Sequence, residues 1–94
     1  MPRFTTRVEL HNATSYETYE RLHAEMEARG FSRTIASGDG TAYHLPSAEY
    51  NFEGNLTRNE VLELAKAGSA RVDRSFAVLV TESAGRVWDG LTAA

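Results

Sequence analysis

Strict alternation of side chains at the start of the chain constrains the fold most. In RFTTRVEL (residues 3–10), the even positions from Phe4 to Leu10 fall on one face. The odd positions, which carry two arginines and a glutamate, fall on the other. A period of two is typical of a strand with one buried face. The chain therefore opens with a half-buried β-strand.

A helix is predicted to follow this strand. Thr14 and Glu17 have the spacing of a capping box, and apolar side chains recur at helical spacing from Tyr19 to Met26. Gly30 is expected to end the helix, since glycine readily adopts the left-handed conformation that closes helices. The pattern predicts a helix over about residues 14–29.

The middle of the chain reads as extended. FSRTIA (31–36) predicts a second strand, which the turn residues 37–40 (SGDG) end. TAYHL (41–45) and AEYNFE (48–53) predict a third strand with a bend at Pro46-Ser47. Alternation puts Ala48, Tyr50 and Phe52 on one side of it.

A second helix and a last strand complete the pattern. Thr57 and Glu60 form another capping box, ahead of a helix that is expected to fray near AGSA (67–70). SFAVLVTE (75–82) is the most strand-like segment. Its apolar residues occupy both faces, which predicts a central strand that is buried on both sides.

The predicted order is strand, helix, strand, strand, helix, strand. This β-α-β-β-α-β order indicates an α+β, ferredoxin-like (split βαβ) fold: a four-stranded antiparallel sheet with two helices on one face. Ninety-four residues make one domain, spanning residues 1–94. Residues 83–94 form a C-terminal tail.

Composition excludes several functions. With no cysteine, the chain has no disulfide, thiolate metal site or cysteine nucleophile. No apolar run approaches the roughly 18 residues of a membrane span, so a cytoplasmic protein is expected. The net charge of −3 argues against bulk capture of nucleic acid, and DNA binding is not expected. All but one of the ten basic residues are arginines, the exception being Lys66.

Few residues offer chemistry. His44 could act as a general base and acid, with a structural histidine on an edge strand as the alternative. His23 borders the apolar stripe of the first helix. Metal-independent RNA cleavage would need a base, an acid and a cation at the phosphate, roles that histidine and Arg21 can fill. No metal-ligand spacing is present, and no metal or cofactor is expected.

Tyr50 and Phe52 have two interpretations. If their side of the strand faces outward, they form a platform on which RNA bases stack. If it faces the helices, they are core residues. The sequence does not decide between the two.

From Arg3 to Glu82 the chain resembles the GhoS family, the antitoxins of type V toxin–antitoxin systems. The resemblance rests on RFTTRVEL, SYETYERLHAEMEARGFS, LTRNEVLELA and SFAVLVTE. It implies a ferredoxin-like fold related to the small CRISPR adaptation nucleases, and an endoribonuclease that cleaves the messenger RNA of a membrane-active toxin. The arginine-bearing helix segment of the family matches YERLHAEM, with Arg21 kept and His23 at the second basic position. The related nucleases pair as dimers through extra strands, which implies a homodimer here. The resemblance thereby makes Arg86-Val87-Trp88 in the tail a candidate extra edge strand, with Trp88 as a cap on its own core as the alternative.

The leading interpretation is a dimeric RNA-acting protein. Arg21, His23 and His44 are its candidate catalytic residues, and the candidate RNA-binding residues are Arg7, Arg33, Tyr50 and Phe52. The rival is a non-enzymatic dimeric binding or assembly module that uses the open sheet face. A dimer that binds a small molecule is a third alternative. Arg7 separates the first two: exposure beside Tyr50 favours RNA, and burial at a two-fold interface favours assembly.

Overall fold

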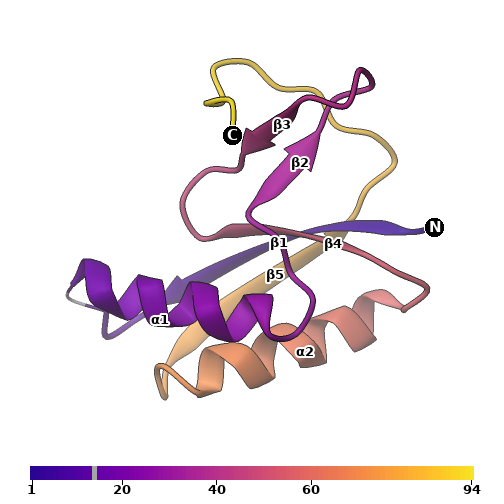
Figure 1. The fold of residues 1–94 in the computed structure, drawn as a ribbon. Coiled ribbons are helices and arrows are strands. Elements are labelled where there is room, and N and C mark those ends of the chain that lie inside the picture. Colours follow the sequence, from indigo (N-terminus) through magenta and orange to yellow (C-terminus); the bar gives the residue numbers. More distant parts are fainter. Residues whose placement is uncertain (14) are drawn as a thin grey trace.

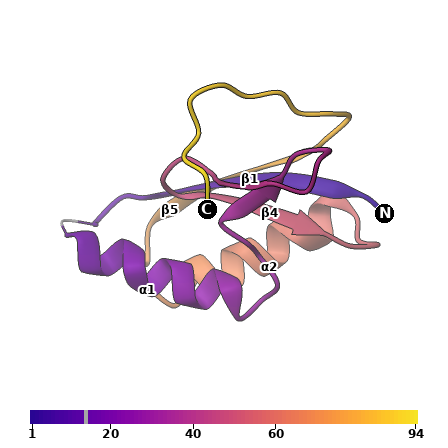
Figure 2. The same cartoon turned by 45° about the horizontal axis from the view of Figure 1, so that its top comes forward.

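The computed structural model describes residues 1–13 and 15–94 and has two layers (Figures 1 and 2). Its elements are β1 (Arg3–Leu10), α1 (Tyr16–Glu27), β2 (Thr34–Ala36), β3 (Ala42–His44), β4 (Glu49–Glu53), α2 (Arg58–Ala70) and β5 (Phe76–Glu82). An antiparallel sheet has the order β4-β1-β5, and β2 and β3 form a separate antiparallel hairpin. The predicted α+β class is confirmed, with both helices on one face of the sheet (Figure 2).

The single four-stranded sheet is not what the structure contains. Residues 41–53 do not form one bent strand, because β3 pairs with β2 whereas β4 pairs with β1. The chain turns between them at Pro46 and Ala48, and Ala48 has a positive φ of 62°. This left-handed conformation redirects the backbone out of a continuous strand. The hairpin then extends from the β4 side of the sheet (Figure 1).

The prediction that the last strand is central and buried on both faces is wrong. β5 lies at an edge of the sheet and β1 lies in the centre. One face of β5 packs on the core through Phe76, Val78 and Val80, whereas Leu79 on the other face is 64% exposed. Apolar residues on both faces of a strand therefore did not indicate burial here.

The predicted helix ends compare well with the structure. The α2 capping box is present: Thr57 N donates to Glu60 Oε1 (2.8 Å), and Glu60 N donates to the Thr57 hydroxyl (3.1 Å). α2 continues to Ala70 without the expected fraying. Thr14, and with it the first predicted capping box, lies outside the described residues.

Gly30 closes α1 as predicted. It has a φ of 94°, and the next residue, Phe31, donates its backbone N–H to Met26 O (3.1 Å). Phe31 then turns into the core, which also holds Phe4, Val8, Leu22 and Val61. The even-numbered face of β1 is thus the buried face, as its alternation predicts.

The tail runs over the sheet face that the helices leave open (Figure 2). Residues 86–88 form no strand. The chain instead pairs with β3 further on, where Tyr43 and Ala93 form a bridge and His44 N donates to Thr92 O (2.9 Å). Trp88 packs against Tyr43, with ring centroids 5.7 Å apart. The tail therefore ties the hairpin to the sheet.

Candidate functional site

The three candidate catalytic residues do not share a surface. Arg21 is exposed on α1, His23 is buried on the same helix, and His44 is exposed on β3 of the hairpin. α1 lies with α2 on the helical side of the sheet, whereas the β2–β3 hairpin extends away from it (Figure 1). Acid–base catalysis requires its groups within hydrogen-bond reach of one reacting phosphate. In the part of the chain that the structure describes, Arg21, His23 and His44 therefore cannot contact the same phosphate.

His23 instead forms a buried pair with Tyr50. The His23 Nδ1 atom and the Tyr50 hydroxyl oxygen lie 2.6 Å apart, and the two rings meet edge to face at 5.7 Å. Residue exposure is 6% for His23 and 0% for Tyr50. The pair links α1 to β4 through the core.

Burial sets the protonation of this pair. Desolvation is the main cause that lowers the pKa of His23, and the positive charge of Arg33 lowers it further, whereas Glu20 and Glu27 raise it. Desolvation also raises the pKa of Tyr50. A neutral imidazole beside a protonated phenol follows, and the two groups share one hydrogen bond whose donor is set by the histidine tautomer.

Tyr50 and Phe52 do not form a stacking platform. Both face the helices on β4, where Tyr50 is fully buried and Phe52 is 9% exposed. Phe52 packs against Phe4 and Phe31, with centroid distances of 6.2 and 5.2 Å. Bases need an exposed ring face to stack. The core interpretation of these aromatic residues therefore holds.

Arg7 and Arg33 are both exposed. Arg7 lies opposite Glu49 on β4 and Leu79 on β5, on the face of the sheet away from Tyr50. It is neither beside Tyr50 nor covered in the single chain. Arg33 lies near the His23–Tyr50 pair, where its charge acts on both pKa values.

Sequence reasoning missed a polar network on the open face. Arg3 Nε lies 3.4 Å from Glu53 Oε1, and Asn51 Nδ2 donates to Glu53 Oε2 (3.1 Å). Arg86 Nη1 donates to Asn51 Oδ1 (2.9 Å) and to the Thr5 hydroxyl (3.3 Å). Strand alternation places the first members on one face, but no local signal brings Arg86 from the tail to join them.

The outer edge of β5 is a second feature of interest. No described residue pairs with this edge, since the sheet ends at β5. From Phe76 to Thr81 the strand carries no charge and no proline, and its register with β1 runs without a bulge. Long, flat, apolar edges of this kind are templates for pairing with another chain.

No family model and no curated protein matches the chain. Across residues 1–13 and 15–94, no group of three or more His, Asp or Glu residues could hold a metal ion. His11 lies 3.2 Å from Glu9 Oε1 without a third such partner. None of the helices in this part of the chain is long and apolar enough to cross a membrane.

Proposed function

We propose that the chain is a non-enzymatic assembly module that pairs with a second copy of itself through the edge of β5. The observation that carries this proposal is the unpaired edge of β5, which is uncharged from Phe76 to Thr81 and on which Leu79 is 64% exposed. A free apolar edge strand is normally either protected from pairing, by charges, proline, a bulge or a covering segment, or paired with a partner strand. In the part of the chain that the structure describes, residues Phe76 to Thr81 have none of these protective features.

The direction of the backbone N–H and C=O groups along β5 is compatible with a symmetric partner strand. Ser83 N donates to Arg3 O (2.8 Å) and His11 N donates to Ser75 O (3.0 Å), both in register with β1. The odd residues of β5 thus direct their backbone groups toward β1. Because these directions alternate along a strand, the even residues direct theirs to the free edge.

One antiparallel register pairs the whole strand with its copy. It places Phe76 opposite Glu82 and Val78 opposite Val80, and these even residues form the hydrogen-bonded pairs. Leu79 then lies opposite its own copy on the two-fold axis. This position is a non-hydrogen-bonded pair, in which the Cα atoms approach to about 4.5 Å and the side chains contact closely. The large exposed apolar side chain of the strand is thereby covered.

Charge also favours this register. The only charged residue of the strand is Glu82, which lies opposite an apolar residue rather than another acid. Arg74 of the second copy would be its diagonal neighbour, within reach of a long side chain. Opposite charges meet at each end of the paired strands, and no like charges face each other.

Sedimentation velocity tests the proposal. The 10.4 kDa chain is expected to sediment as a dimer of about 21 kDa. Leu79→Lys places two like charges on the axis and is expected to give monomers. Val87→Lys is the matched control, since Val87 is 99% exposed but lies off the strand. A monomeric wild type, or a dimer unaffected by Leu79→Lys, would overturn the proposal.

We also propose that the fold is a variant of the ferredoxin-like arrangement. Its support is Ser32, just before β2, which exchanges both backbone hydrogen bonds with Asn51 on the outer edge of β4 (2.8 and 2.7 Å). A fourth strand reduced to one bridge explains this contact. The rest of that strand has turned away into the hairpin.

Membership of the GhoS family, action on RNA and a cytoplasmic location stay predictions from the sequence, and the assembly proposal requires none of them. Incubation with a mixed RNA pool in EDTA tests metal-independent cleavage. Discrete products that disappear in Arg21→Ala and His44→Ala, with folding intact, would restore the enzymatic interpretation.

A further inference from the structure

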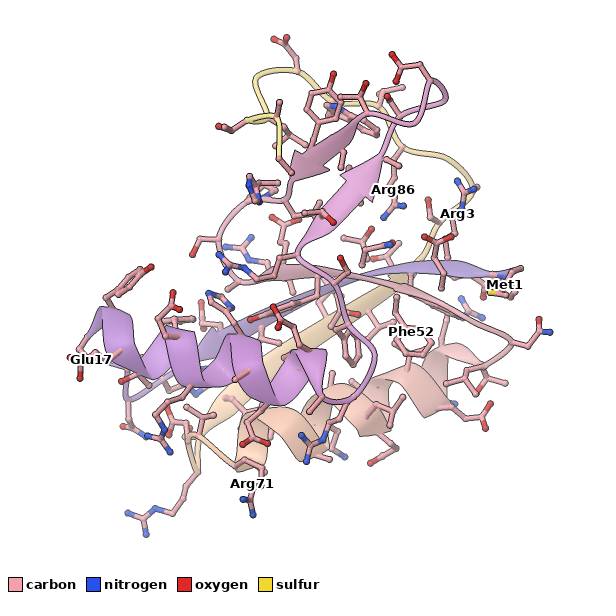
Figure 3. The ribbon with its side chains drawn as sticks, viewed as in Figure 1. Met1, Arg3, Glu17, Phe52, Arg71 and Arg86 are labelled. Carbon is pink, nitrogen blue, oxygen red and sulfur yellow. The ribbon has the colours of Figure 1, made fainter. Side chains whose placement is uncertain are left out.

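A cavity of about 410 Å³ opens where β1 begins and the tail crosses the sheet. The residues that line it come from three segments far apart in the sequence. They include Arg3, Ser37, Ser83, Arg86 and Trp88. Figure 3 shows Arg3 and Arg86 on the same side of the sheet. The volume lies within the range of small-molecule sites, roughly 300–1,000 Å³.

Arg86 is a half-buried cation whose direct hydrogen-bond partners are all neutral. Its two hydrogen bonds go to neutral acceptors, the Thr5 hydroxyl and the Asn51 amide oxygen. It forms no ion pair with any residue that the structure describes. A buried charge is costly unless an opposite charge or strong hydrogen bonds compensate it.

One edge of the Arg86 guanidinium is left unused. Both hydrogen bonds leave from Nη1, so Nε and Nη2 bond to no described atom. These two nitrogens form one of the parallel forks with which arginine binds carboxylate or phosphate in bidentate fashion. Thr5 and Asn51 fix the other edge of the planar group and so orient the fork.

The charges around Arg86 are positive in excess and would be balanced by a bound anion. Burial is the main cause that lowers the pKa of Arg86, and the positive charge of Arg3 lowers it further, whereas Glu53 opposes them. Glu53 is the one carboxylate in the network, and it already accepts from Asn51 and pairs with Arg3. Two guanidinium groups thus share a single carboxylate.

We propose that this cavity binds a phosphate group, either as inorganic phosphate or at the end of a small phosphorylated molecule. The free fork of Arg86 would take two phosphate oxygens, and Arg3 would supply the second charge. The Ser83 hydroxyl accepts from Gly85 N (3.1 Å), which leaves its proton free to donate. The cavity is larger than a phosphate ion needs, so it has room for an attached group against Trp88.

This site does not require the proposed dimer, because its two arginines, Arg3 and Arg86, lie outside β5. It lies beyond the end of β5, at residues 83–86, whereas the two-fold axis passes through Leu79. Oligomeric state and ligand binding are therefore separate measurements, and either can fail alone.

Fluorescence of Trp88, the only tryptophan, reports directly on the cavity. The protein is titrated with inorganic phosphate, adenosine monophosphate and adenosine, with potassium chloride matching ionic strength. A saturable change with phosphate or the monophosphate, but not with adenosine or chloride, is expected. Binding of the monophosphate alone would identify a phosphorylated ligand rather than free phosphate.

Two variants test the arginines. Arg86→Gln and Arg3→Gln are each expected to weaken binding by about tenfold or more. Arg86 also holds the tail, so its variant alone could act by releasing the tail. Arg3 lies outside the tail and separates the two effects. Arg58→Gln, an exposed arginine on α2, is the control and should bind as the wild type does. No saturable change by about 10 mM ligand, equal binding of adenosine, or an unchanged affinity in either cavity variant would overturn the proposal.

Discussion

The Tyr50 hydroxyl and His23 Nδ1 lie 2.6 Å apart inside the core, and this contact joins β4 to α1. Both groups are polar and both are shielded from water, so each satisfies the other. The relationship gives His23 a structural role and accounts for a tyrosine, rather than a phenylalanine, at this core position.

Tyr50→Phe is expected to destabilise the protein by about 1–3 kcal/mol, because it leaves the buried His23 Nδ1 without a partner. Urea unfolding followed by circular dichroism measures the change. Tyr43→Phe is the matched control: Tyr43 is half-buried, and its hydroxyl bonds to no described residue. The control should change stability by less than about 0.5 kcal/mol. Equal effects of the two substitutions would contradict the pairing.

Stability should fall in mild acid. The folded-state pKa of His23 is lowered, so the unfolded chain binds the proton more tightly. The stability is fully present above the unfolded pKa of about 6.5 and is lost as pH falls below it. Urea titrations at several pH values should show this loss in the wild type and not in His23→Gln. The exposed His44→Gln serves as control and should keep the wild-type loss; an unchanged loss in His23→Gln would show that another group is responsible.

Asp73 should stabilise the fold through its ionised form. It accepts from Asn12 Nδ2 and Asn12 N (2.8 Å each) and from Ser75 N (3.1 Å). These bonds, that from the Asn12 side chain first, lower the pKa of Asp73 to about 2. Stability is thus present above the unfolded pKa of about 3.9 and is lost as pH falls toward 2.

Asp73→Asn should therefore lower the thermal midpoint at pH 7, and the difference from the wild type should shrink toward pH 2. Differential scanning calorimetry across this range measures both. Asp89→Asn, in the exposed tail, is the control. A difference that stays constant with pH would mean that the ionised carboxylate is not the cause.

Ala48 should tolerate glycine well. Its φ of 62° costs an L-residue about 1–2 kcal/mol, which glycine avoids at a smaller cost in chain entropy. Ala48→Gly is expected to raise stability by roughly 0.5–1 kcal/mol, as measured by urea unfolding. Ala36→Gly, at the end of β2, should lower it by a similar amount. A destabilised Ala48→Gly variant would speak against the left-handed turn.

Local patterns predicted much of the fold and little of the site. Alternation in β1, the α2 capping box and the Gly30 stop depend on neighbours in sequence, and each is present. The edge position of β5 depends on the order in which distant strands pair, which the composition of the strand does not encode. Likewise, His23 finds its partner 27 residues away, and Arg86 reaches Thr5 across 81 residues. Side-chain type alone could not have indicated either contact.

Cross-linking at the two-fold axis tests the assembly most directly. The chain has no cysteine, so Leu79→Cys introduces a single thiol. In the proposed register the two Cα atoms lie about 4.5 Å apart, within the range of a disulfide. Thr81→Cys is the control on the same face, since its copies would be about 14 Å apart. Under mild oxidation at low protein concentration, Leu79→Cys should form a covalent dimer and Thr81→Cys should not. No cross-link at position 79, or equal cross-linking at both positions, would contradict pairing of β5 with its own copy.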